Sequence, residues 1–260
     1  MSGYEGKFGE ILKSGMINSR NDLLYDQQGN TKNLNWLLEP LKDVTQDAVN
    51  QNMEAVASYM IAERTVELAG KFERGYNITG IGAGLFSDLS VAIKALQEFD
   101  ALPEQKRQQI TEATERYRQM AGDVLRYLVD KGRLSESQYE QIIKDNTHYV
   151  ALQRIIETGP NQEIEVYHEK KRSLGSSGTP VHEIKGSVRK IQNPYISLLD
   201  SIYRSIREAD RNEVLKSFRD MLVSDRMMGE GEPEPLAEIG VRVKDGEKNT
   251  IPIFINGKRE

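Results

Sequence analysis

Apolar residues recur at every third or fourth position over much of this chain, a spacing that predicts amphipathic helices. A first helix is predicted over about residues 40–72, with Pro40 in its first turn, where the missing N–H costs nothing. Its apolar face consists of Val44, Ala48, Met53, Val56, Met60 and Ile61. A second helix is predicted over about residues 85–99, and Pro103 opens a third. The third has the longest apolar stripe, made of Ile110, Ala113, Tyr117, Met120, Ala121, Val124 and Leu128. Helices with such short connections predict a bundle.

Local end signals divide the helical part further. Gly132 is expected to end the third helix as a left-handed cap. Ser135 and Gln138 have the spacing of a capping box, which predicts a short helix to about Ile143. A last long helix is predicted from Asn193-Pro194 to about residue 224. Its apolar face consists of Leu199, Ile202, Tyr203, Ile206, Val214, Phe218 and Leu222.

Two regions have strand-like composition instead. "HYVALQRI" and "EIEVYH" lie between about 148 and 190, together with the flexible loop "SLGSSGTP". Near the C-terminus, Asp245-Gly246 is a turn signal, and alternating isoleucines follow it. The predicted fold class is therefore mainly α: a helical bundle with a small β-containing insertion (about 148–190) and a C-terminal β-hairpin.

The same patterns predict three regions. Residues 1–39 form an N-terminal arm, residues 40–228 a helical domain with an irregular basic insertion at 148–192, and residues 229–260 an acidic linker and a small β element. Asn256-Gly257 is a second turn signal, after which only three residues remain. Because a strand normally follows such a turn, we expect either a fragment of a longer protein or a C-terminal edge completed by another chain.

Four glycines interrupt the helical pattern in "ERGYNITGIGAGLF": Gly75, Gly80, Gly82 and Gly84. A dinucleotide fingerprint would need a preceding strand and a βαβ unit, whereas a helix is predicted before this stretch. A loop between helices is the favoured interpretation.

Composition excludes several classes of chemistry. The chain has 260 residues, a formal net charge of -5 and no cysteine, so disulfides and thiolate chemistry are excluded. Its start resembles no secretory signal, and no apolar run reaches the ~18–20 residues of a membrane span. His148, His168 and His182 lack metal-ligand spacing, so no metal or other cofactor is predicted.

A basic segment stands out in this acidic chain. Residues 169–190 contain six basic and two acidic side chains, a local charge of +4. The basic residues are Lys170, Lys171, Arg172, Lys185, Arg189 and Lys190. With Tyr149, Tyr167 and Tyr195 close by in sequence, this segment predicts either a grip on a nucleic-acid backbone or a merely solvated loop.

Two motifs carry a family resemblance. "HYVALQR" resembles a Tyr-Val-Pro-Leu-x-Arg element, and "KGSVRKIQNPYISLL" is similar to the Gly-Ser-x-Arg-x-x-x-Asn/Asp-Pro element that follows it. "ADRNEVLKSFRDML" and "IPIFINGKRE" resemble the segments that come next. The ordered series, over about residues 55–260, resembles the large polyvalent protein-associated modules of phages and conjugative elements. Ala151 departs from the pattern, which commonly has proline there.

The resemblance implies a context and no reaction. Such modules belong to very long multidomain proteins that travel with DNA into a recipient cell, next to separate enzymes. The positions that match are Tyr149, Val150, Leu152, Arg154, Gly186, Ser187, Arg189, Asn193 and Pro194. Their residue types suit joints between helices, since Asn is a good N-cap, Pro a good first-turn residue, and Arg a good anchor for carbonyl or carboxylate oxygens.

The predicted function is therefore a non-enzymatic structural or interaction module of a phage or mobile-element protein that supports delivery or assembly with DNA. Its expected partners are other domains of a longer polypeptide or virion proteins, and its expected location is the virion or the cytoplasm of the recipient cell. Two alternatives stay open. One is nucleic-acid binding through the loop at 169–190; the other is an enzyme of unrecognised type centred on the insertion, using Glu163, Glu165, His148 or His168.

Overall fold

The computed structural model describes residues 3–73, 89–152, 155–158, 163–166, 192–228 and 252–259. Helices account for most of these residues, as the sequence predicts. They are α1 (Gly3–Ser14), α2 (Leu34–Leu38), the 3-10 turn η1 (Glu39–Leu41), α3 (Gln46–Glu73), α4 (Leu89–Asp100), α5 (Glu104–Asp130), α6 (Glu136–Asp145) and α7 (Pro194–Met228). None of the helices in these ranges is both long enough and apolar enough to cross a bilayer.

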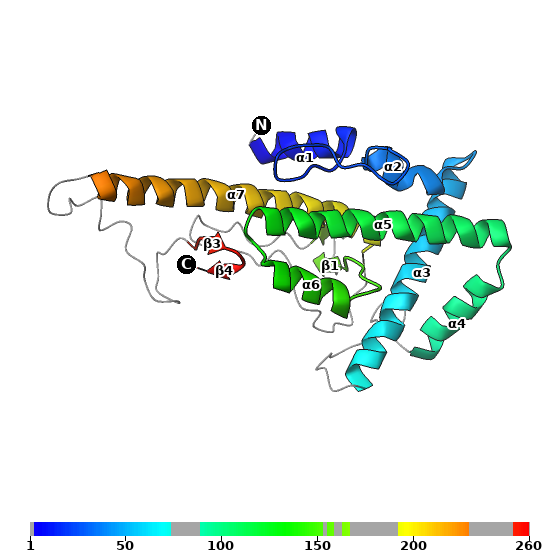
Figure 1. The fold of residues 1–260 in the computed structure, drawn as a ribbon. Coiled ribbons are helices and arrows are strands. Elements are labelled where there is room, and N and C mark those ends of the chain that lie inside the picture. Colours follow the sequence, from blue (N-terminus) through cyan, green and yellow to red (C-terminus); the bar gives the residue numbers. More distant parts are fainter. Residues whose placement is uncertain are drawn as a thin grey trace.

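The centre of the fold is a pair of long helices, α5 and α7, that run side by side in the same direction (Figure 1). Near the start of the contact, Tyr117 of α5 meets Pro194 of α7. Further along, Tyr127 Oη donates a hydrogen bond of 2.9 Å to Asp210 Oδ1. The parallel arrangement requires the chain between the two helices to return to the same end of the bundle.

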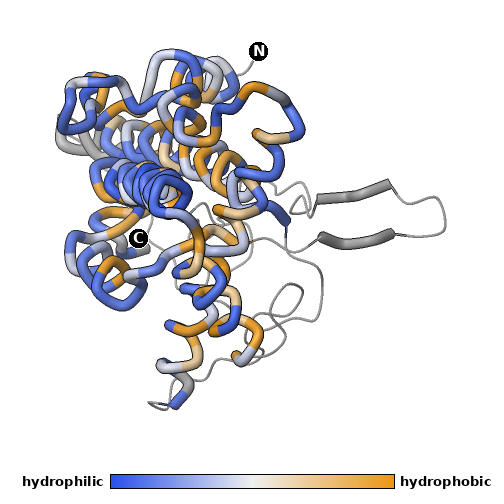
Figure 2. Tube along the Cα trace, turned by 90° about the vertical axis from the view of Figure 1, so that its right-hand side faces the viewer, coloured by the Kyte–Doolittle hydropathy of each residue, from blue (hydrophilic) through white to orange (hydrophobic). Residues whose placement is uncertain are grey.

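The other helices cover this pair. Helix α3 crosses α5 steeply and carries α4 along its own length, while α6 lies beside α5 and α1 beside α7 (Figure 1). Lys7 of α1 forms an ion pair of 2.9 Å with Asp210. Hydrophobic and hydrophilic residues alternate along the helices in Figure 2, as amphipathic helices require. Their fully buried side chains include Val56, Met60, Tyr117, Leu128, Leu198, Ile202 and Ile206.

The predicted helix-end signals are confirmed. Gly132 has φ 73°, and its N–H and that of Arg133 donate to the carbonyls of Val129 and Leu128, which is the Schellman pattern. The capping box of Ser135 and Gln138 is present, and it starts α6. Helix α7 begins at Pro194, as predicted.

The predicted start of the first helix is wrong. Pro40 lies in the 3-10 turn η1, and α3 begins only at Gln46. The buried Asn52 donates to the carbonyl of Leu41 (3.1 Å), which ends the turn, and Thr45 Oγ1 accepts from the N–H of Ala48 (3.2 Å) at the start of the helix. Val44 therefore lies before the helix and is 98% exposed rather than part of its apolar face.

The described residues contain little strand. Strand β1 (Ile155–Thr158) pairs antiparallel with β2 (Glu163–Val166) inside the predicted insertion. The predicted C-terminal β-hairpin is not supported. Its turn at Asp245-Gly246 lies outside the described residues, and beyond it only the two-residue strands β3 (Phe254–Ile255) and β4 (Lys258–Arg259) are found.

Several other predictions also lie outside the described residues. These are the glycine-rich stretch with Gly75, Gly80, Gly82 and Gly84, the whole basic segment at 169–190, and the acidic linker from residue 229.

Candidate functional site

A single tyrosine joins the two motif segments that the sequence singles out. Tyr117 of α5 is fully buried, and its hydroxyl accepts a hydrogen bond of 3.0 Å from the N–H of Ala151. The same hydroxyl donates a hydrogen bond of 3.2 Å to the carbonyl of Pro194. Burial raises the pKa of Tyr117 well above its ordinary value, so the hydroxyl keeps its proton and makes both bonds.

The neighbouring motif residues pack around this contact. Val150 and Pro194 are buried, and Leu152 packs against the main core. The ring of Tyr195 meets that of Tyr117 edge to face, with centroids 5.5 Å apart. Asn193 Oδ1 accepts a hydrogen bond of 2.9 Å from the N–H of Tyr195. The described motif residues thus hold two segments of the chain against α5. We call this contact of Tyr117 with Ala151 and Pro194 the joint at Tyr117.

Ala151 gains a role from this geometry. Its N–H is the donor to the buried Tyr117 hydroxyl, and proline at this position would have no N–H to donate. Alanine at residue 151 therefore permits a hydrogen bond that proline could not make.

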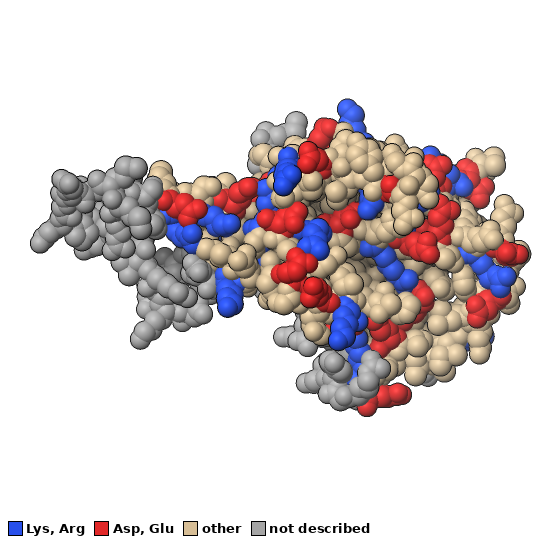
Figure 3. Space-filling model, viewed as in Figure 1, with Lys and Arg blue, Asp and Glu red and all other residues tan. Residues whose placement is uncertain are grey.

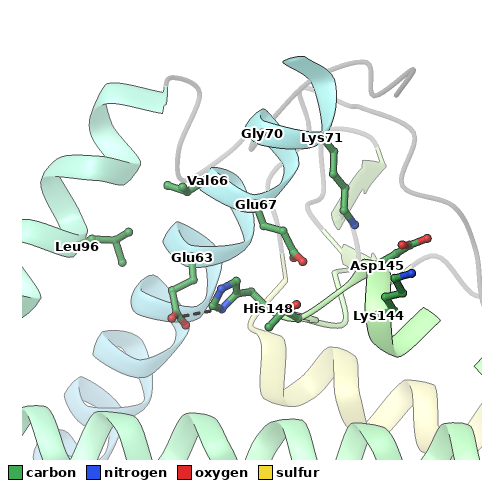
Figure 4. A pocket seen from close by; sticks show the side chains of 10 residues that line it. Glu63, Val66, Glu67, Gly70, Lys71, Leu96, Lys144, Asp145 and His148 are labelled. Carbon is green, nitrogen blue, oxygen red and sulfur yellow. Dashed lines mark ion pairs between the residues drawn. The ribbon is translucent and has the colours of Figure 1, made fainter. Parts of the chain in front are cut away.

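His148, next to this joint, lies instead on the wall of a pocket of about 500 Å³ (Figure 4). One side of the pocket is α3, with Leu96 of α4 beside it; the other comes from α6 and the residues that follow it. Its lining residues are Glu63, Val66, Glu67, Gly70, Lys71, Leu96, Lys144, Asp145, Thr147 and His148.

Glu63 of α3 contacts His148, Tyr59 and Arg118. Its Oε1 lies 3.4 Å from His148 Nδ1, a contact marked by the dashed line in Figure 4 that is an ion pair when the imidazole is protonated. The same oxygen accepts a hydrogen bond of 2.9 Å from the hydroxyl of Tyr59. Its Oε2 accepts a hydrogen bond of 2.6 Å from Arg118. Burial, together with the negative charge of Glu63, raises the pKa of Tyr59 to about 12.

A second group of charges is also paired within the wall. Arg64 forms an ion pair with Glu67 and donates a hydrogen bond of 2.8 Å to Asn146 Oδ1. Lys71 donates to the same oxygen over 3.1 Å. These contacts tie α3 to the end of α6, which gives them a structural role.

The side chains of the pocket offer few groups for catalysis or metal binding. A histidine beside a carboxylate can act as a general base, and the His148 side chain is 37% exposed. Glu63, however, is already bound by Tyr59 and Arg118. Within the described ranges no group of three or more His, Asp or Glu side chains is placed to hold a metal ion.

Most of the predicted binding residues belong to parts of the chain that the structure does not describe. Arg154, Lys170, Lys171, Arg172, Lys185, Gly186, Ser187, Arg189 and Lys190 lie outside the described residues, as do His168 and His182. The backbone of Glu163 and Glu165 belongs to β2, but their side chains are not described. On the face seen in Figure 3, basic and acidic side chains are interspersed.

Nothing in the sequence pattern indicates the pocket residues on α3. Glu63, Glu67 and Lys71 have the spacing of an ordinary charged helix face, and their partners Arg118 and Asn146 are far away in the sequence. No periodic pattern reports such contacts, because they depend on how α3 crosses the bundle.

No known protein family, curated protein or solved structure matches this chain.

Proposed function

We propose that this chain is a non-enzymatic interaction module of a phage or mobile-element multidomain protein, and that it supports delivery or assembly with DNA. The observation that carries the proposal is the joint at Tyr117. The described residues that match the family motifs serve to hold the chain to α5, and an architectural role is what such a module needs.

The pocket supports the same interpretation. Glu67 is paired with Arg64 within α3, and Glu63 with Arg118 of α5, whereas an enzyme site holds reactive groups ready for a substrate. Paired charges of this kind fix the relative position of helices.

The experiment is to follow the protein in the element that encodes it. Mass spectrometry of purified particles, or of recipient cells after transfer, should detect peptides of this chain in fixed ratio to the other structural proteins. Soluble host proteins of similar abundance serve as the control for carry-over. Absence of the chain from both particles and recipients would contradict the proposal.

An enzyme remains the second candidate, because His148 and Glu63 meet in a pocket. The variant His148→Gln separates the two functions, since it keeps a polar side chain of similar reach but removes the imidazole. A module should transfer DNA at an unchanged frequency, counted as recipients per donor. A fall of about a hundredfold or more in a variant that still folds would favour general-base catalysis.

A further inference from the structure

The C-terminal residues 252–259 lie against the end of α5 and the side of α7, as β3 and β4 in Figure 1. We propose that Asn212, Arg133 and the turn at Gly132 form a peptide-recognition site for a Phe-x-Asn-Gly segment. The chain's own C-terminal segment occupies the site here, and the same sequence on a separate molecule would fit it. The inference does not depend on a phage or mobile-element origin.

Asn212 reads the peptide backbone. Its side-chain amide donates a hydrogen bond of 2.9 Å to the carbonyl of Phe254, and its Oδ1 accepts one of 2.7 Å from the N–H of the same residue. Two paired strands exchange the same kind of double hydrogen bond, so the amide acts as a short strand edge. Asn212 is only 2% exposed, and a further bond of 3.1 Å to the carbonyl of Lys131 fixes its orientation.

Arg133 reads the aromatic side chain. Its guanidinium carbon lies 3.9 Å from the centroid of the Phe254 ring, well within the range of a cation–π interaction. The Arg133 side chain is 3% exposed and lies 3.6 Å from Glu208. Burial lowers the pKa of Arg133, yet a guanidinium remains charged in proteins. A buried cation over the ring favours an aromatic residue at this position.

The turn supplies the third element of recognition. Asn256 has φ 48° and Gly257 has φ 75°, the left-handed pair that an Asn-Gly turn provides. The N–H of Gly257 donates a hydrogen bond of 3.1 Å to the carbonyl of Gly132. A Cβ at Gly257 would lie 2.6 Å from the backbone nitrogen of Ser135. The site therefore accepts glycine here and rejects larger residues.

The receptor side of the site is held together by contacts of its own. The turn at Gly132 is closed by hydrogen bonds to the last turn of α5, and Ser135 is fixed by its capping box with Gln138. Neither set of bonds involves residues 252–259. Because this surface is already ordered, it loses little conformational entropy when it binds the peptide.

The experiment uses the full chain with its own segment displaced. The variant Gly257→Val should expel residues 252–259 through the clash with Ser135, while the helices stay folded by circular dichroism. A fluorescein-labelled peptide of the sequence Pro-Ile-Phe-Ile-Asn-Gly-Lys-Arg-Glu is then titrated and followed by fluorescence anisotropy. Saturable binding at least tenfold tighter than to the unaltered chain is expected, because there the tethered segment competes.

Variants on the peptide side keep the test independent of protein folding. Peptides carrying Phe254→Ala or Gly257→Val should each bind at least tenfold more weakly than the parent peptide. Asn212→Ala, added to the Gly257→Val chain, should also reduce binding at least tenfold. The proposal is overturned if the displaced chain shows no saturable binding, or if the Gly257→Val peptide binds as well as the parent.

Discussion

Two buried tyrosines of the central joint differ in what their hydroxyls do. Tyr117 Oη has two backbone partners, the N–H of Ala151 and the carbonyl of Pro194. Tyr195 Oη is buried beside it and has no hydrogen-bond partner within the described part of the chain. The same chemical change, loss of one hydroxyl, should therefore have different consequences at the two positions.

We expect Tyr117→Phe to lower the free energy of unfolding by about 1–3 kcal/mol, because it leaves a buried donor and a buried acceptor unsatisfied. Tyr195→Phe is the matched control and should leave stability unchanged or slightly raised. Urea denaturation followed by circular dichroism measures both. Equal losses in the two variants would mean that the hydroxyl of Tyr117 does not act as the joint.

Asp26 is a second residue with a specific electrostatic role. Burial raises its pKa, but hydrogen bonds from Asn30, from Trp36 Nε1 (2.7 Å) and from the N–H of Gln28 outweigh this and lower the pKa to about 2. Because the pKa is lower in the folded state than in the unfolded state, this carboxylate contributes stability above its ordinary pKa of 3.8. That contribution is lost as the pH falls towards about 2.

The variant Asp26→Asn tests the sign of this effect. It should be less stable than the parent at pH 5, and the difference should shrink steadily down to pH 2.5, where the parent carboxylate is losing its advantage. Trp36 is the only tryptophan in the chain and donates to Asp26, so its fluorescence reports urea unfolding at each pH. A stability difference that is independent of pH would contradict the prediction.

At the scale of the element, α5 and its end contain two glycines in opposite situations. Gly132 ends the helix with φ 73°, a conformation that side chains disfavour. Gly122 lies inside the helix, and a Cβ built there would meet nothing within 4 Å. One glycine is required by the backbone, and the other only weakens the helix.

We therefore expect opposite signs for the same substitution. Gly132→Ala should lower stability by about 1 kcal/mol, while Gly122→Ala should raise it by about 0.5–1 kcal/mol. Thermal melts of the two variants and the parent show the signs directly. A melting temperature that rises for Gly132→Ala would rule out the left-handed cap as the reason for glycine.

Helix ends could be predicted from the sequence where the capping signal was local. Gly132, Ser135 with Gln138, and Pro194 mark the predicted helix ends because capping involves residues only a few positions apart. The burial of a helix face could not be predicted where it depends on how far a neighbouring helix extends. Val214 and Phe218 belong to the predicted apolar face of α7 but are 68% and 47% exposed, because α7 continues past the end of α5.

In the candidate site, too, contacts between elements far apart in the sequence could not be predicted. His148 was a predicted candidate, but its partner Glu63 was not, because nothing in the sequence links α3 to the residues after α6. Asn212 and Arg133 likewise meet the C-terminal segment only in the folded chain.

For the whole molecule, charge is the property that bears on nucleic acid. The net charge is -5, whereas residues 169–190 carry +4. If this segment binds single-stranded DNA, affinity should fall steeply with salt, because phosphate contacts release counterions. The triple variant Lys170→Ala, Lys171→Ala and Arg172→Ala should bind more weakly, with a flatter salt dependence.

Anisotropy of a labelled oligonucleotide at several salt concentrations measures both effects. Lys94→Ala is the control, since Lys94 is a well-exposed lysine on α4 and is far from the basic segment in the sequence. Identical affinity and salt dependence for the parent and the triple variant would dispose of nucleic-acid binding by this segment.

The hydrogen bonds of Tyr117 bear on whether the segment between Ala151 and Pro194 can be replaced. Ala151 and Pro194 both lie within hydrogen-bonding distance of one oxygen, so the two ends of the segment between them are close together. We therefore expect this segment to be exchangeable for one of another length, because a longer or shorter closed loop changes the entropy only slightly. Replacing residues 155–190 with a Gly-Ser linker should leave the helical circular dichroism and the melting temperature of the bundle unchanged. Loss of the helical signal would show that the bundle needs these residues to fold.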